Sequence, residues 1–202
     1  TGNTINVKAI NTAGLQSYNG ATTLNDNLNA NAAGAITVTG AANLATKAIE
    51  IATNGGLATD DITFTSTING AEGLTLNAGA GDVLISGIVG GTARPTGVAL
   101  TGNTINVKAI NTAGLQSYTG ATTLNGDLST DAGASAGTLT FNGAVTLGNN
   151  VILDTNAAGL DAAINFSGGT STINGNKTLT VDAGGANVTF GGVIGGVNRV
   201  GA

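Results

Sequence analysis

The sequence predicts an all-β fold, a parallel β-helix (β-solenoid) with rungs of about 20 to 25 residues. Three observations lead to this fold class. The chain is a tandem repeat, its apolar residues alternate with polar residues over short runs, and Gly-rich or Asn-Gly turns separate these runs. Repeated short strands are typical of architectures in which each unit stacks on the next one.

The tandem repeat divides the 202 residues into two units, residues 1–100 and residues 101–202. The segment TGNTINVKAINTAGLQSYNGATTLN opens the chain and returns at Thr101 with one difference, Thr119 in place of Asn19. Later segments return as well, with a few inserted residues that we expect to lie in loops. The two units are predicted to stack as one continuous rod, and the missing initiating Met suggests a mature or excised piece of a longer protein.

Short runs with a period of two predict the strands, because side chains alternate between the two faces of a strand. The clearest runs pair Ile5 with Val7, Ile36 with Val38, Ile62 with Phe64, Leu74 with Leu76, and Val188 with Phe190. Asn-Gly pairs between runs supply the positive φ angles that sharp corners need. Such pairs occur at Asn69-Gly70, Asn142-Gly143 and Asn174-Gly175.

The spacing of the strands favours a solenoid over an antiparallel sandwich or barrel. Comparable strands recur at about 21 to 25 residues, which suits one circuit with two or three strands. Examples are the steps from Ile62 to Val83, from Val83 to Ile105 and from Ile164 to Val188. With about 4.8 Å between neighbouring strands, roughly nine rungs form a rod about 40 Å long.

Composition excludes several classes of function. The chain contains no Cys and no His, which excludes Ser-His-Asp and Cys-His catalysis as well as thiolate and imidazole metal ligands. A net charge of −5, with six scattered basic residues, argues against nucleic-acid binding. No apolar run is long enough to span a bilayer, so we expect no membrane insertion.

Carboxylates are the remaining candidates for acid and base catalysis. Stacking on successive rungs is predicted for Asp61 with Asp82 and for Asp161 with Asp182, while Asp60 and Asp61 are sequence neighbours. However, Asn187 replaces Asp82 in the second copy and Asn77 replaces Asp182 in the first. A catalytic carboxylate does not tolerate an amide, whereas Asp and Asn both serve in turns. We therefore interpret these aspartates as turn residues, and we expect Asp60 and Asp61 to be solvated.

Other candidates also favour structural roles. AGAGDVLIS, which begins at Ala78, is similar to a calcium-binding nonapeptide, but it occurs once and its copy lacks the Asp. Arg94 and Arg199 follow Gly-Gly pairs with no carboxylate cluster nearby in sequence, which favours a surface role. Tyr18 and Tyr118 are either exposed contact residues or a cover for the core. The sequence thus predicts no catalytic, cofactor-binding or metal-binding residue and no cofactor.

Three segments carry a resemblance to a known family: LTGNTINVKAINTAGLQSYTGATTLNGDL, GTLTFNGAVTLGNN and STINGNKTLTVDAGGANVTFGGVIGG. Their short Gly-, Asn- and Thr-rich strands resemble the stalks of filamentous haemagglutinin-like bacterial surface proteins, which are exoproteins of two-partner secretion or passengers of autotransporters. The resemblance implies a right-handed coil, secretion, attachment to the bacterial cell surface, and adhesion. It covers nearly the whole chain, although the family's amino-terminal secretion domain and any receptor-binding insertion are missing.

The predicted function is a non-enzymatic stalk or filament segment of an extracellular adhesin. Open strand edges at the ends of such a rod favour end-to-end self-association, and a host or surface receptor would bind regions outside this chain. Two alternatives stay open. A carbohydrate-active β-helix enzyme requires a groove with three or more carboxylates, and an ice-binding solenoid requires flat ranks of outward Thr, which we expect irregular rung lengths to break.

Overall fold

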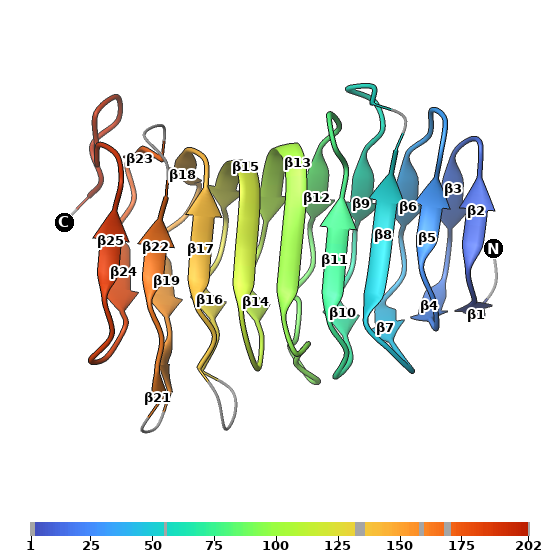
Figure 1. Ribbon diagram of the computed structural model, residues 1–202, viewed down its shortest axis with the longest axis horizontal. Coiled ribbons are helices and arrows are strands. Elements are labelled where there is room, and N and C mark those ends of the chain that lie inside the picture. The colour runs from blue at the N-terminus through green and yellow to red at the C-terminus, as the bar shows by residue number, and fades with distance from the viewer. Residues whose placement is uncertain (1–2, 55, 132–135, 158–159, 168–170, 202) are drawn as a thin grey trace.

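The structure, a computed structural model, describes residues 3–54, 56–131, 136–157, 160–167 and 171–201. Within these ranges the chain forms strands β1 to β25 and no helix (Figure 1). The strands pair in parallel, except that β20 (Asn156–Ala157) and β21 (Leu160–Asp161) pair antiparallel. These pairings confirm the predicted all-β architecture of parallel strands, and they are compatible with a β-solenoid.

The parallel strands form three columns, and the chain visits them in the same order on every circuit. The first column contains β1 (Thr4–Val7), β4 (Ala21–Leu24), β7 (Ala42–Leu44), β10 (Ile68–Asn69), β14 (Ile110–Asn111), β16 (Leu128–Ser129), β19 (Val151–Asp154) and β24 (Leu179–Asp182), with Val89 bridging Ile68 and Ile110. The second contains β2 (Ile10–Thr12), β5 (Leu28–Ala30), β8 (Ile49–Thr53), β11 (Leu74–Asn77), the first parts of β13 (Val98–Val107) and β15 (Gln116–Leu124), β17 (Leu139–Asn142), β22 (Ile164–Phe166) and β25 (Val188–Phe190). The third contains β3 (Gln16–Tyr18), β6 (Ile36–Val38), β9 (Ile62–Phe64), β12 (Val83–Ile85), the later parts of β13 and β15, β18 (Val145–Leu147) and β23 (Ile173–Asn174).

The register of the columns matches the predicted spacing. Val83 pairs with Ile62 on one side and with Ile105 on the other, and Ile164 pairs with Val188. The circuits differ in length because loops at the corners differ, while the strands keep their register.

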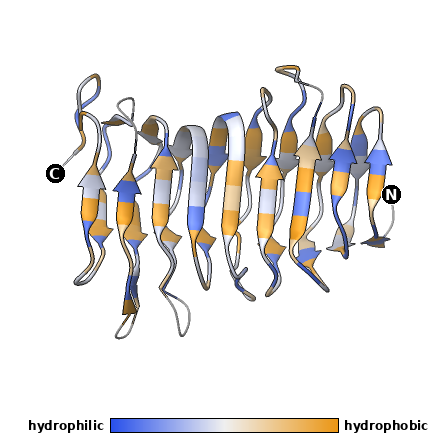
Figure 2. Ribbon diagram, in the orientation of Figure 1, coloured by the Kyte–Doolittle hydropathy of each residue, from blue (hydrophilic) through white to orange (hydrophobic). Residues whose placement is uncertain are grey.

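Alternating side chains build the core. Along β12, for example, Val83 and Ile85 are buried and Leu84 between them is exposed. Apolar and polar residues alternate along many strands in this way (Figure 2). The inward residues of all three columns form one hydrophobic cluster, which extends through both sequence copies from Val7 to Ala183.

An aromatic stack runs inside the second column of the second copy. Tyr118, Phe141 and Phe166 stack with ring centroids 5.0 and 4.9 Å apart, and Phe166 stacks on Phe190 at 5.1 Å. These distances match the spacing of neighbouring strands, so each ring packs on the ring of the next rung.

The two sequence copies do not occupy equivalent columns. Thr4–Val7 lies in the first column, whereas the identical segment Thr104–Val107 lies in the third. Between them the chain completes four circuits and then passes once more through the first and second columns. The repeat is therefore not a whole number of circuits, and the second copy begins one column behind the first.

Candidate functional site

The buried carboxylate of Asp60 closes a loop. Its Oδ1 accepts a hydrogen bond from Gly34 N at 2.9 Å, and its Oδ2 accepts one from Leu57 N at 2.8 Å. Both oxygens thus bind backbone N–H groups, as expected of a turn residue. The prediction that this side chain is solvated is wrong, because Asp60 is fully buried between the groups that it binds.

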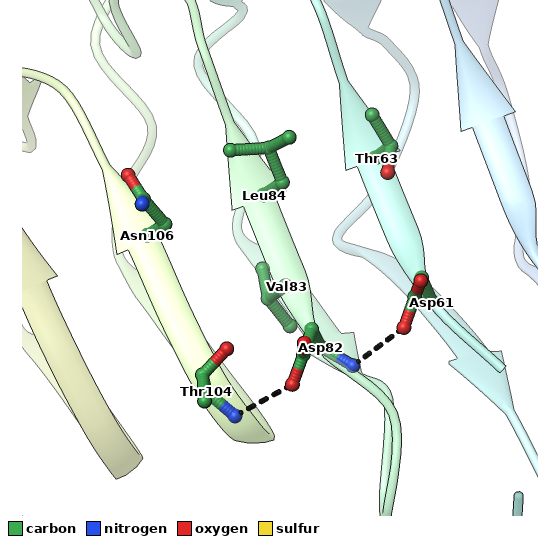
Figure 3. Close-up of a pocket in the computed structure, with 7 residues that line it drawn as sticks. All are labelled: Asp61, Thr63, Asp82, Val83, Leu84, Thr104 and Asn106. Carbon is green, nitrogen blue, oxygen red and sulfur yellow. Dashed lines mark hydrogen bonds between the residues drawn. The ribbon is translucent and has the colours of Figure 1, made fainter. Parts of the chain in front are cut away.

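Asp61 and Asp82 stack on successive rungs of the third column, as predicted (Figure 3). Asp61 Oδ1 accepts a hydrogen bond from Asp82 N at 2.9 Å, and Asp82 Oδ1 accepts from Thr104 N at 2.9 Å and from Asn103 Nδ2 at 3.1 Å. Burial raises the pKa of Asp82, but the hydrogen bonds from Thr104 and Asn103 outweigh it, so its pKa lies below the usual value. The stacked carboxylates connect three adjacent rungs.

A shallow depression lies beside these two carboxylates and is also lined by Thr63, Leu84, Thr104 and Asn106. It contains no third acidic side chain among its lining residues, and the two carboxylates at its edge bind backbone N–H groups (Figure 3). The arrangement therefore offers polar contacts at the surface without the group of three carboxylates that the enzyme alternative requires.

Asp161 and Asp182 do not stack on one another, so this part of the prediction is wrong. Asp182 pairs with Asp154 in the first column, and Asp161 lies in the β20–β21 hairpin. The hairpin lengthens the circuit, so that a gap of about 21 residues no longer equals one rung. Both carboxylates still bind backbone: Asp161 Oδ2 accepts from Gly185 N at 2.6 Å, and Asp182 Oδ1 accepts from Gly184 N at 3.1 Å.

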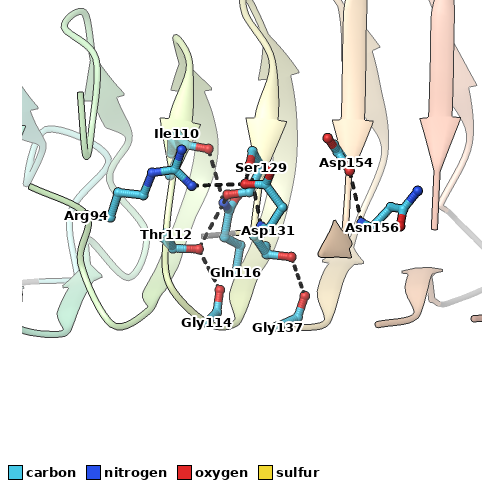
Figure 4. Close-up of polar contacts among 11 residues, drawn as sticks. Arg94, Ile110, Thr112, Gly114, Gln116, Ser129, Asp131, Gly137, Asp154 and Asn156 are labelled. Atoms are coloured by element: carbon cyan, nitrogen blue, oxygen red, sulfur yellow. Dashed lines mark hydrogen bonds and ion pairs between the residues drawn. The ribbon is translucent and has the colours of Figure 1, made fainter. Parts of the chain in front are cut away.

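Arg94 forms an ion pair across the junction of the two copies (Figure 4). Its Nη1 lies 2.9 Å from Asp131 Oδ1, and both side chains are partly exposed. A hydrogen bond from Ser129, together with Arg94, holds the pKa of Asp131 below its usual value against the effect of burial. Arg199, the equivalent of Arg94, makes no ion pair within the described part of the chain.

A polar network lies inside the core (Figure 4). The fully buried Gln116 donates through Nε2 to Ser129 O at 2.8 Å and to Thr112 Oγ1 at 3.2 Å, and its Oε1 accepts from Tyr118 OH at 2.7 Å. Burial raises the pKa of Tyr118 well above its usual value. The first copy repeats this network with Thr12, Gln16 and Tyr18.

The network decides between the two predicted roles of the tyrosines, since both are buried core residues. The part played by the glutamines was not predicted from the sequence. The available signal was the spacing of Gln16 and Tyr18, because residues two apart on a strand share a face and an inward Tyr implies an inward Gln.

Buried threonines close the longer loops. Thr53 Oγ1 donates to Asp60 O at 2.5 Å, Thr130 Oγ1 donates to Gly137 O at 2.6 Å, and Thr155 Oγ1 donates to Ala162 O. Each hydroxyl binds the carbonyl seven residues further along the chain, so these three loops are closed at the same span.

No family model, curated protein or solved structure matches this chain. Within the described ranges, no three acidic side chains lie close enough together to hold a metal ion. None of the described segments forms a helix that could cross a membrane. What the geometry offers is structural chemistry: carboxylates, amides and hydroxyls that bind backbone groups of neighbouring rungs and loops.

Proposed function

We propose that this chain is a structural segment of a secreted bacterial cell-surface adhesin, and that its columns form a right-handed parallel β-solenoid. In this role the segment is a stiff stalk or filament that holds a binding region away from the cell. The observation that supports the proposal most directly is the continuity of the three columns and of their core through both sequence copies. The resemblance to filamentous haemagglutinin-like stalks supports the extracellular location.

In this proposal the rod is stiff because the backbone and side-chain polar groups of each rung are hydrogen-bonded. Strands between the two ends of each column pair on both sides, and in the described residues no buried side-chain nitrogen or oxygen lacks a hydrogen-bond partner. Bending the rod would break ladder hydrogen bonds and separate stacked core side chains such as Phe141 and Phe166. The receptor would bind regions outside this chain.

Negative-stain electron microscopy and small-angle scattering of the purified chain test the proposal. We expect elongated particles about 40 Å long, since roughly nine rungs stack at about 4.8 Å. A spherical particle of the same mass would contradict it.

Ice binding is a second candidate, because the outward side chains of the third column lie in register. One rank on this column runs through Ser17, Thr37, Thr63, Leu84, Asn106, Thr123 and Thr146. Unequal circuit lengths do not break this rank, contrary to the prediction; Leu84 and Asn106 interrupt it. A thermal hysteresis assay separates the two functions, since a stalk segment is expected to show no hysteresis.

A further inference from the structure

An Asn-Gly pair lies on the surface where strand β17 ends. Asn142 is exposed, and the single hydrogen bond of its side chain among the described residues runs from its Nδ2 to Thr119 Oγ1 at 3.4 Å. This distance exceeds the usual upper limit of about 3.2 Å for an N–H···O hydrogen bond. Within the described ranges Gly143 N donates no hydrogen bond. The side-chain amide of Asn142 and the backbone N–H of Gly143 are therefore both weakly held.

Close packing between rungs requires glycine at this turn. A Cβ at Gly143 would lie 2.3 Å from Gly120 O, and a Cβ at Gly40, its equivalent in the first copy, would lie 2.0 Å from a carbonyl oxygen of the preceding rung. Both distances are far below a normal van der Waals contact. The residue before the glycine differs between the copies, Thr39 in the first and Asn142 in the second. The packing thus imposes a glycine directly after Asn142.

An Asn-Gly pair reacts within itself, without an enzyme. The backbone nitrogen of the glycine attacks Cγ of the asparagine, the Cγ–Nδ2 bond breaks, and Nδ2 leaves as ammonia with the proton of the glycine nitrogen. Water then opens the resulting cyclic imide at either carbonyl, which gives aspartate or isoaspartate. The reaction needs a glycine N–H that is not hydrogen-bonded and an asparagine side chain that turns toward it.

Two other Asn-Gly pairs are held against this reaction. Asn69 Oδ1 accepts a hydrogen bond from Thr92 N at 2.9 Å, and Gly70 N donates to Ala93 O at 3.0 Å. The equivalent pair of the second copy, Asn174-Gly175, makes the same two kinds of hydrogen bond at 2.9 and 3.3 Å. Both glycines are buried. In these pairs the side chain is fixed and the glycine N–H is occupied.

We propose that Asn142 is a site of spontaneous deamidation in the folded protein, and that the fold protects Asn69 and Asn174. Gly40 supports the geometry at this turn, because its neighbours on both adjacent rungs are described and its N–H donates no hydrogen bond to them. The inference does not depend on the proposed stalk function. Water is the only co-reactant.

The two products differ in their effect on the fold. Aspartate leaves the backbone unchanged and adds one negative charge to the net charge of −5. Isoaspartate leads the backbone through the former side chain, which adds one methylene between Phe141 and Gly143. Phe141 stacks between Tyr118 and Phe166, and Val145 is buried on the other side of the turn. Because core residues flank the lengthened turn closely, isoaspartate destabilises the fold more than aspartate does.

Peptide mapping by mass spectrometry of the folded chain, aged in neutral buffer, tests the proposal. We expect Asn142 to deamidate about tenfold faster than Asn69 and Asn174, since each of these pairs must first break a backbone hydrogen bond. In urea sufficient to unfold the chain, the three sites should react at similar rates, because only their sequence neighbours then differ. Equal rates in the folded chain, or the same difference in urea, would overturn the proposal.

Two matched variants separate the turn from its sequence. Thr39→Asn builds an Asn-Gly pair at the equivalent turn of the first copy, and we expect it to deamidate at a rate similar to that of Asn142. Asn142→Thr introduces the residue type found at Thr39, and it should abolish deamidation in its own peptide while the unfolding curve stays unchanged. A Thr39→Asn chain that stays intact at this turn would contradict the argument from turn geometry and overturn the proposal.

Discussion

Ile105 lies fully buried between Val83 and Thr122 in the third column, whereas Ile5, with the same sequence neighbours, pairs with Thr22 alone in the first column. Identical sequence segments thus occupy two different positions in the fold. Within the described residues, one segment has strand partners on both sides and the other has a strand partner on one side.

The two equivalent glycines Gly14 and Gly114 differ in what lies next to them. We expect Gly114→Ala to lower the free energy of unfolding by about 1–3 kcal/mol, because the added Cβ would meet Thr96 O at 2.3 Å. Gly14→Ala has open space around it and is expected to change stability by less than about 0.5 kcal/mol. Urea titrations of both variants measure the difference, and equal effects would contradict the stacking order.

The hydrogen bond between Tyr118 and Gln116 predicts a cost for Tyr118→Phe. The variant leaves Gln116 Oε1 buried without the donor 2.7 Å away, which destabilises the fold by about 1–3 kcal/mol. Adding Gln116→Leu should destabilise the fold further, because Ser129 O then loses the Gln116 donor 2.8 Å away. Thermal unfolding followed by circular dichroism measures both variants; a neutral Tyr118→Phe would show that the bond contributes nothing.

The raised pKa of Tyr118 predicts a loss of stability in alkaline solution. The unfolded chain ionises near pH 10 and the folded chain only well above it, so the contribution is complete below about pH 10 and declines as pH rises further. Unfolding midpoints measured from pH 8 to pH 11 should fall for the native chain. The decline should be smaller for Tyr118→Phe, and equal slopes would contradict the assignment.

Asp82 predicts the opposite pH dependence, because its folded pKa is lowered. Its contribution is present above the unfolded pKa of about 3.9 and is lost as pH falls through the folded pKa. Asp82→Asn should cost less than about 1 kcal/mol at neutral pH, since Asn187 occupies this position in the second copy. Acid titration of both proteins checks this, and an unchanged acid slope in the variant would contradict it.

The ion pair of Arg94 with Asp131 predicts a small contribution to stability that depends on salt. Asp131→Asn, which introduces the residue type found at Asn31 in the first copy, should lower the free energy of unfolding by about 0.2 to 1 kcal/mol at low salt, the usual range of an exposed ion pair. The loss should vanish at high salt, as measured by urea titration, and an equal loss at high salt would contradict the assignment.

Much of the fold follows from the sequence because its determinants are local. The apolar residues Val83 and Ile85, two positions apart, indicate a strand, and the tandem repeat indicates that successive strands stack. The sequence does not predict that Thr4 lies in the first column and its equivalent Thr104 in the third. This difference depends on how many strands form one circuit. The stack of Asp161 on Asp182 was wrongly predicted because Asp161 lies in the β20–β21 hairpin, which lengthens its circuit.

In the candidate site, too, some contacts could be predicted from the sequence and others could not. The exchange of Asp82 for Asn187 indicated a turn role, and the bonds to Thr104 N and Asn103 agree with it. The partner of Arg94 was not predictable, since Asp131 approaches it only after the chain has completed further circuits.

Distances between spin labels on one outward rank test the stacked architecture most directly, and the chain has no Cys to interfere. From Thr37 the rank reaches Thr146 in five rungs, and from Ser17 it reaches Thr146 in six. Pulsed electron paramagnetic resonance on Thr37→Cys/Thr146→Cys and Ser17→Cys/Thr146→Cys should give backbone separations of about 24 Å and about 29 Å. Two equal distances, or a shorter distance for the pair with Ser17, would contradict the stack.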